Sequence, residues 1–239
     1  MVVRIIDTMS HPRFSTYLYA SGQDRDRALL LYLWNAKLGA SFHIPIQAAE
    51  VALRNRVNHA LVAAFGANWW KDAKFSALID RERATDLKTV KTRIQRKQLT
   101  LDTDQVVAGL SFGFWAGMLQ PRYNPTIWSQ HLRSSFPHLP VTENRASLFK
   151  RGGEIAGLRN RISHHEPLLK ADAMRHYSET IQFLRWLCPK TADWVKQLGA
   201  HHVIDHSQPL LPQLQQLDIQ QVNHVASLTH TDQHYDQLI

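Results

Sequence analysis

The stretch PIQAAEVALRNRVNHALVAAFG, residues 45–66, decides the fold class of this chain. Its apolar residues recur every three or four positions, which is the period of an amphipathic helix. Pro45 suits the first turn of a helix, and Gly66 suits the position just after its end. The stretch therefore predicts a helix of about six turns.

Helical periodicity continues on both sides of this stretch, and no run alternates as a half-buried strand would. We therefore predict an all-α fold. Residues 1–204 are expected to form a single helical domain. Residues 205–239 are polar, acidic and rich in Gln and His, and we expect a tail that is loosely attached or partly helical. The further helices are expected at residues 25–38, 81–99, 102–119, 124–137, 142–166, 170–187 and 189–198.

The charge of the chain is distributed unevenly. The whole chain carries a formal net charge of +8, but no Lys or Arg follows residue 200, where four Asp occur. Residues 1–200 therefore carry +12, four more than the whole chain. A body this basic favours a polyanionic partner, and we expect RNA or DNA rather than a membrane.

Composition restricts the class of protein further. Apolar residues make up 44% and charged residues 20% of the chain, which is ordinary for a globular protein. The single cysteine, Cys188, excludes an internal disulfide framework and a cysteine-based zinc site. The N-terminal residues lack the apolar core of a signal peptide, and the most apolar run, residues 28–34, is too short to span a bilayer. We therefore expect a cytoplasmic protein.

A short phrase occurs twice, as EVALRNRVNH at residues 50–59 and as EIAGLRNRISHHEP at residues 154–167. Alignment of Leu53 with Leu158 matches the next three residues, Arg-Asn-Arg, and also matches His59 with His164. In the second copy a helix places Asn160 and His164 on one face. There Pro167 stops the helix near two histidines, whereas His59 is followed by more helix and favours a structural role.

The chain resembles the Abi-like (abortive infection, Abi_2) family of the HEPN superfamily. The matching segments are LYLWNAKLGASFHIPIQAAEVALRNRVNHAL at 31–61, FGANWW at 65–70, LSFGFWAGML at 110–119, LRNRISHHEPLL at 158–169 and LCPKTADWV at 187–195. The resemblance implies a HEPN-like helical bundle with additional helices, usually dimeric. Many HEPN proteins are metal-independent endoribonucleases that act as toxins or in phage defence.

The HEPN motif is an arginine, a polar residue and a histidine four to six residues after the arginine. In this sequence it falls on Arg159, Asn160 and His164, and His165 extends it. The resemblance therefore implies catalytic roles for these four residues. It also implies RNA as a partner, homodimerisation through the motif helices, an antitoxin or phage component as a trigger, and no cofactor.

The mechanism expected from these residues uses the 2′-hydroxyl of RNA as the nucleophile. His164 transfers the proton, and Arg159 holds the scissile phosphate. Asn160 orients the histidine or the phosphate by hydrogen bonding. The products would be a 2′,3′-cyclic phosphate and a 5′-hydroxyl. Residues expected to bind RNA are Arg161, Arg54, Asn55, Lys88, Lys91, Arg93, Arg96 and Lys97.

Each of these expectations has an alternative. The basic segment 81–97 also fits a solvated helix face. The aromatic side chains that could stack on bases have the spacing and neighbours of core residues, and we expect core packing for Trp69, Trp70, Phe112, Phe114, Trp115 and Trp128. No metal site is expected, because His164, His165 and Glu166 lack a metal-binding spacing.

Two other functions remain open at the level of sequence. One is a non-catalytic module that binds RNA or a nucleotide, or only dimerises. The other is a sensor whose cleavage is masked until a phage component binds, with the acidic tail covering the basic surface.

Overall fold

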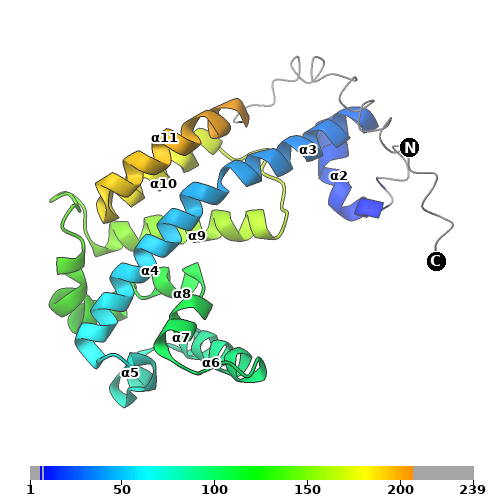
Figure 1. Ribbon diagram of the computed structural model, residues 1–239. Coiled ribbons are helices and arrows are strands. Elements are labelled where there is room, and N and C mark those ends of the chain that lie inside the picture. The colour runs from blue at the N-terminus through cyan, green and yellow to red at the C-terminus, as the bar shows by residue number, and fades with distance from the viewer. Residues whose placement is uncertain (1–5, 7, 207–239) are drawn as a thin grey trace. The chain divides into compact units, whose positions relative to one another are not determined.

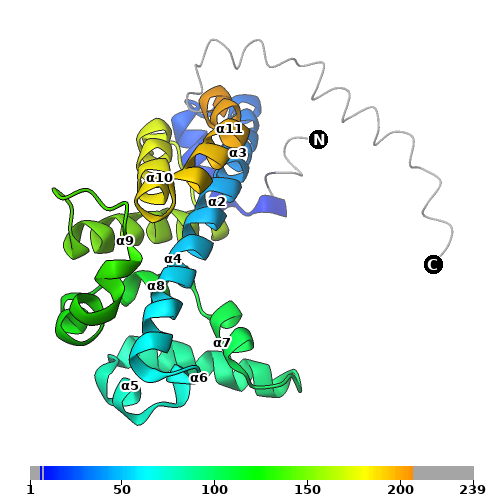
Figure 2. The same cartoon turned by 60° about the vertical axis from the view of Figure 1, so that its left-hand side comes forward.

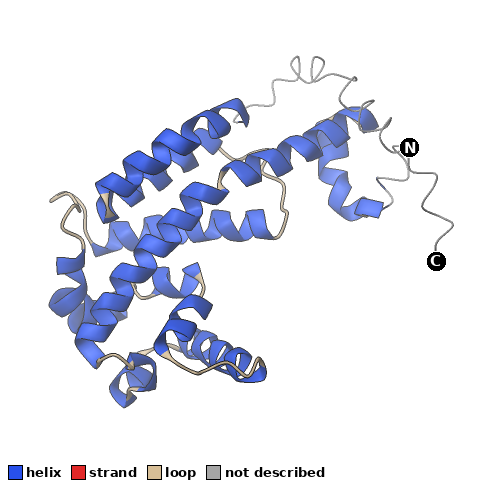
Figure 3. Cartoon of the chain, in the orientation of Figure 1, coloured by secondary structure: helices blue, strands red, loops and turns tan. Residues whose placement is uncertain are grey.

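The computed structural model describes residue 6 and residues 8–206. Every regular element among them is helical, and none is a strand, so the all-α prediction is confirmed for this part of the chain (Figure 3). The HEPN-like arrangement of these helices stays a prediction. The predicted tail lies outside the described residues except for its first two, which end the last helix.

The contacts divide the described residues into two compact units, of which one is Gly39–Ile204 and the other holds the rest. In the smaller unit, Phe14 and Tyr17 of α2 (His11–Ala20) form an aromatic cluster with Tyr32 of the next helix, and the three rings are mutual neighbours. The helix α3 (Arg25–Ser41) continues past the boundary between the units. The prediction of a single domain over 1–204 stays a prediction.

The larger unit is built around one long helix, α4 (His43–Phe65). Figures 1 and 2 show α4 running through this unit, with α10 and α11 near one end and α5, α6 and α7 near the other. The helices α10 (Ala173–Leu187) and α8 (Phe112–Gly117) pack on α4, and α9 (Arg145–Ser163) packs on both of them. The remaining elements are η1 (Trp69–Lys71), α5 (Ala73–Leu78), α6 (Arg81–Arg96), α7 (Thr103–Gly109), η2 (Pro121–Tyr123), η3 (Asn124–Leu132), η4 (Arg133–Ser135) and α11 (Pro189–His206).

Two predicted helices differ from the structure. The stretch 102–119 breaks at Leu110 and Ser111, both extended, because the Ser111 hydroxyl accepts the Phe114 N–H at 3.3 Å and starts α8 anew. The stretch 124–137 forms the π-helix η3 followed by the 3₁₀ turn η4. A side-chain cap and the choice among helix types are local competitions that apolar periodicity does not report.

The aromatic residues assigned to the core are all buried, as predicted. Trp69 meets Phe75 edge-on, with the ring centroids 5.0 Å apart, and Phe114 meets Trp115 in the same way. The Trp69 indole also donates to Asn58 Oδ1 of α4 at 2.9 Å. These contacts tie η1, α5 and α8 to the middle of α4.

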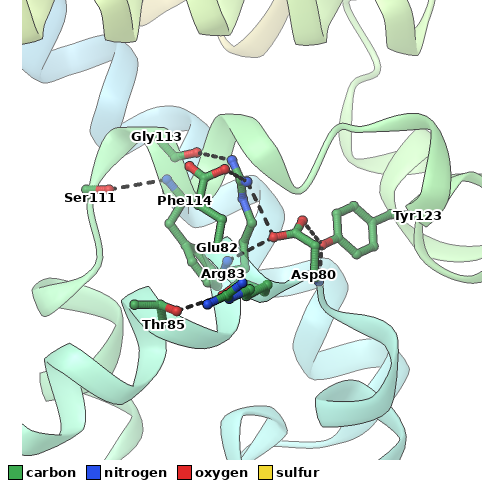
Figure 4. A network of polar contacts seen from close by, with 9 residues as sticks. Asp80, Glu82, Arg83, Thr85, Ser111, Gly113, Phe114 and Tyr123 are labelled. Atoms are coloured by element: carbon green, nitrogen blue, oxygen red, sulfur yellow. Dashed lines mark hydrogen bonds and ion pairs between the residues drawn. The ribbon is translucent and has the colours of Figure 1, made fainter.

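A buried arginine joins α6 to α8 and η2 (Figure 4). Arg83 is 6% exposed, forms ion pairs with Asp80 at 3.5 Å and Glu82 at 2.6 Å, and donates to the Gly113 carbonyl. The Tyr123 hydroxyl donates to the same Asp80 carboxylate at 2.8 Å. Burial opposes ionisation of Asp80, but these hydrogen bonds and the guanidinium outweigh it and lower the pKa of Asp80.

Candidate functional site

The two copies of the repeated phrase lie on two different helices of the larger unit. The first copy lies in the middle of α4, where Leu53 and Val57 are fully buried. The second lies in the last turns of α9, where Leu158 is buried. In both copies the apolar positions fix which face meets the core, so the Arg-Asn pairs lie toward the surface.

Contacts along the helices give the relative direction of α4 and α9. The Leu53 side chain of α4 comes within 3.8 Å of the point where a Cβ on Gly152 of α9 would lie. Ten residues further along α9, the Ile162 side chain comes within 3.4 Å of the point where a Cβ on Gly39 would lie. Gly39 lies four residues before the start of α4. The chain of α9 therefore advances from the middle of α4 back toward the beginning of α4.

Glu50 of α4 lies near the first arginine of each copy. This half-buried carboxylate lies within electrostatic range of Arg159 from α9 and Arg54 from its own helix, and it accepts the backbone N–H of Phe112. Burial raises the pKa of Glu50, and both arginines and the hydrogen bond oppose that shift. Both guanidiniums are therefore within electrostatic range of one carboxylate on α4.

The asparagine of each copy lies against the arginine that precedes it. Arg54 Nε donates to Asn55 Oδ1 at 3.4 Å, and Arg159 Nη1 donates to Asn160 Oδ1 at 3.3 Å. Both asparagines are exposed and both arginines are half-buried. Each Arg-Asn pair therefore presents an oriented guanidinium at the edge of the protein surface.

The second arginine of each copy is occupied by the backbone of the protein. Arg56 donates to the carbonyl of Leu187, the last residue of α10, at 3.0 Å. Arg161 donates to the Pro167 carbonyl at 2.7 Å and pairs with Glu166 at 3.5 Å. Arg161 was predicted to bind RNA, and its contacts favour a structural role in fixing the segment after α9.

The two histidines of the second copy lie just past the end of α9, rather than in its last turn as expected. His164 caps the helix, and His165 has φ 56°, in the left-handed region. The His165 N–H bonds to Ile162 O at 3.0 Å and the Glu166 N–H bonds to Arg161 O at 2.9 Å, which is a Schellman motif. The motif, rather than Pro167, ends the helix and leaves both imidazoles exposed.

The histidine of the first copy, His59, is exposed and lies far from His164 of the second copy. From the contact of Leu53 with Gly152, His59 lies six residues onward along α4, whereas His164 lies twelve residues onward along α9 in the other direction. The two histidines are therefore more than about 15 Å apart. Within one chain, the first arginines of the two copies both lie within electrostatic range of Glu50, whereas the two histidines lie far apart.

The predicted RNA-binding cations of α6 do not share one face. Buried residues of this helix include Leu87, Val90 and Ile94, and the five cations are spread over about 240° around the rest of the helix. Lys91 lies half-buried over the Trp70 ring, with its Nζ 5.8 Å from the ring centroid, and Arg93 donates to the Gly109 carbonyl at 2.8 Å. The other three, Lys88, Arg96 and Lys97, are exposed, so one strand of RNA cannot meet all five.

Two residues near the motif were not selected from the sequence. Glu50 lies four positions before Arg54, a spacing that places them on one helix face and was available as a signal. His176 of α10 is half-buried, and burial lowers its pKa. Arg175 and Arg161 lower it further, and Glu179 and Asp172 oppose them. Nothing in its sequence context marks His176.

Two other features, a membrane-spanning helix and a cluster of metal ligands, are not found among the described residues. No helix in this part of the chain is both long enough and apolar enough to cross a membrane. No group of three or more His, Cys, Asp or Glu side chains gathers here as ligands of a metal ion would.

No match was found in comparisons with protein-family models, curated proteins and solved structures. The resemblance to the HEPN superfamily therefore stays an expectation from the sequence segments given above.

Proposed function

We propose that this chain is a metal-independent endoribonuclease of the HEPN type. The observation that supports this most directly is that Arg54 and Arg159, the first arginine of each copy, both lie within electrostatic range of Glu50 and are both half-buried. The second arginine of each copy is bound to backbone carbonyls instead. Two half-buried guanidiniums at the surface suit a phosphodiester, which offers two free oxygens.

In the proposed reaction the 2′-oxygen of RNA attacks the adjacent phosphorus as its proton passes to a base. The bond from phosphorus to the 5′-oxygen breaks, and an acid protonates that oxygen. Arg159 and Arg54 stabilise the charge on the phosphate, and Asn160 and Asn55 keep those guanidiniums oriented. The products are a 2′,3′-cyclic phosphate and a 5′-hydroxyl.

His164 is proposed for proton transfer because its imidazole is exposed at the end of α9, five residues after Arg159. An imidazole changes its charge near neutral pH, so it serves as acid or base there. The reaction needs two such transfers, and His59 lies too far away to supply the second. We place it on His164 of a second copy in a homodimer that faces α9 to α9, with His165 beside it.

The His164→Ala protein is expected to cleave RNA about 10²- to 10⁴-fold more slowly than the wild type. The measurement is incubation of each protein with total RNA in EDTA, followed by analysis of the end groups. His59→Ala is the matched control, since it removes an exposed motif histidine from α4 and should leave the rate unchanged. Undiminished cleavage by His164→Ala would rule out its assigned role.

The non-catalytic alternative gives a different result in the same assay. RNA binding by the wild type without any cleavage would favour a binding module. If cleavage is found, the resemblance implies a role in phage defence or toxicity, under the control of an antitoxin or a phage component. Sedimentation of the protein at several concentrations tests for the homodimer.

A further inference from the structure

Two lysines from different elements lie against one buried tryptophan. Lys71 of η1 has its Nζ 4.5 Å from the centroid of the Trp70 ring, and Lys91 of α6 has its Nζ 5.8 Å from the same ring centroid. Because both distances are measured to one ring, the two ammonium groups lie within about 10 Å of each other. This separation suits one phosphate between them or two successive phosphates of a nucleic-acid strand.

The Trp70 ring is held in place, so it gives the two lysines a fixed common neighbour. Trp70 is 2% exposed, and its indole N–H donates to the Thr103 hydroxyl of α7 at 3.0 Å. The same hydroxyl donates to the Ala67 carbonyl at 2.8 Å. The negative face of the ring attracts both cations and restricts where their side chains lie. The ring itself is covered, so it offers no surface on which a base could stack.

Both ammonium groups lack an anionic partner. Lys71 is exposed and Lys91 is half-buried, and neither belongs to an ion pair within the described part of the chain. The carboxylates of Asp72 and Asp102 accept backbone N–H groups as the caps of α5 and α7. Two positive charges this close repel each other, and partial burial costs Lys91 some of its hydration. A bound anion offsets both costs.

We propose that Lys71 and Lys91 together bind a backbone phosphate of single-stranded RNA, at a place separate from the proposed cleavage site. This inference rests on the proposed function for the identity of the strand. The contact is made to phosphate alone, so it strengthens RNA binding without selecting a base sequence. It pairs Lys91, which was expected to bind RNA, with Lys71, which the sequence did not mark.

The distance from the cleavage site follows from contacts along α4. Trp69, the neighbour of Trp70, donates to Asn58 in the second half of α4. Ile162, two residues before His164, lies against Gly39, which precedes α4. Between its first residue and Asn58, α4 rises by about 20 Å. The phosphate at the two lysines is therefore not the one that is cleaved, and only a strand that spans both places gains affinity from them.

The test is substitution of both lysines by methionine, which keeps an unbranched side chain over the Trp70 ring and removes the charge. The ligand is a 12-nucleotide RNA with 2′-O-methyl groups, which cannot be cleaved by 2′-hydroxyl attack. In 50 mM salt the double variant Lys71→Met, Lys91→Met should bind about five- to thirtyfold more weakly than the wild type. Its slope of log Kd against log salt concentration should be smaller by about 0.7–1.4. Thermal unfolding checks that the variant is folded.

The matched control is the double variant Lys190→Met, Lys196→Met. These two lysines are exposed on α11, near the other end of α4 from α6 (Figure 1), and their substitution removes the same amount of charge. The affinity of the control for the RNA should stay within about twofold of the wild type. An equal loss in both double variants would show that only the net charge matters, and it would overturn the inference.

Cleavage of the same RNA sequence with free 2′-hydroxyl groups separates the inference from the proposed function. The Lys71→Met, Lys91→Met protein should have a higher KM and an unchanged kcat. A lower kcat would place the lysines at the cleavage site and overturn the inference, as would an affinity equal to that of the wild type. Weaker binding by this variant together with no cleavage by the wild type supports the inference and refutes only the nuclease. No RNA binding by the wild type refutes both.

Discussion

At the scale of single residues, two helix ends place an ordinary L-residue where glycine is usual. His165 follows α9 with φ 56°, and Gln98 follows α6 with φ 55°. Both complete a Schellman motif, the second through the Gln98 N–H to Gln95 O at 2.9 Å and the Leu99 N–H to Ile94 O at 3.2 Å. A side chain in this backbone region carries a steric cost of roughly 1–2 kcal/mol.

The His165→Gly protein is therefore expected to be more stable than the wild type by about 0.5–1 kcal/mol, after the greater chain entropy of unfolded glycine is subtracted. Unfolding in urea measures the gain. Gln98→Gly is the control and should give a similar gain. If His165 assists at the site, only His165→Gly should lose cleavage rate. Equal rates for both variants would remove His165 from the catalytic set.

At this scale the sequence predicted the buried aromatic residues correctly but missed residues whose partners lie far away in the chain. The aromatic residues were assigned to the core correctly, because large apolar side chains at helical spacing have few other places to go. Glu50 was missed because its importance comes from Arg159, more than a hundred positions away in sequence. Asn58, the position at which the two copies differ most, binds the Trp69 indole, and no local pattern reveals that partner.

At the scale of elements, the two arginines of each copy perform different tasks. On α4, Arg54 donates to the exposed Asn55, and Arg56 donates to the last carbonyl of α10 at 3.0 Å. A cation at the C-terminal end of a helix also interacts favourably with the helix dipole. The same division holds on α9, where Arg159 donates to the exposed Asn160 and Arg161 donates to the Pro167 carbonyl.

Substitution of Arg54 and Arg56 by glutamine should separate binding from stability. Arg56→Gln leaves a partly buried carbonyl without its charged donor and should reduce the free energy of unfolding by about 1–3 kcal/mol. Its affinity for RNA should be unchanged. Arg54→Gln should bind RNA more weakly, with a lower salt dependence, and should lose little stability. Urea unfolding and RNA titrations over a range of salt concentrations make both measurements, and a reversed result would contradict the assignment.

Helix positions were predicted well and helix ends less well. Apolar periodicity is a property of the sequence alone, so the helices at 25–41, 43–65, 81–96 and 145–163 lie close to where they were expected. The ends depend on individual hydrogen bonds. Ser111 starts a new helix inside 102–119, and α9 ends at Ser163, three residues before the expected end at 166, because His165 is left-handed.

At the scale of the whole molecule, the sequence predicted the all-α class but not the packing that creates the site. The convergence of α4, α8 and α9 depends on close approaches such as that of Gly152 to Leu53, Ala116 and Phe183. The buried Arg83 is another such feature. Its place among the predicted basic residues of 81–97 gave no sign that it would be enclosed by α6, α8 and η2.

Gly117→Ala tests this packing. A Cβ at Gly117 would lie 2.1 Å from Arg83 Nη2 and 2.2 Å from its Nε, so the guanidinium has to leave its carboxylate and carbonyl partners. We expect a loss of about 1–3 kcal/mol in the free energy of unfolding. Gly113→Ala is the control in the same helix, where the nearest atom is 3.6 Å away and the expected effect is small or stabilising. Equal stabilities of the two variants would contradict the structural role of Arg83.

The positions of Arg54 and Arg56 on α4 also have a mechanical consequence. Side chains two positions apart point about 200° apart around a helix, so these arginines act on nearly opposite sides of α4. A ligand that pulls on Arg54 applies a torque to the helix, and the hydrogen bond from Arg56 to Leu187 O resists it. If RNA binds at Arg54 as proposed, the end of α10, where the chain turns into α11, is the place where this torque would be transmitted.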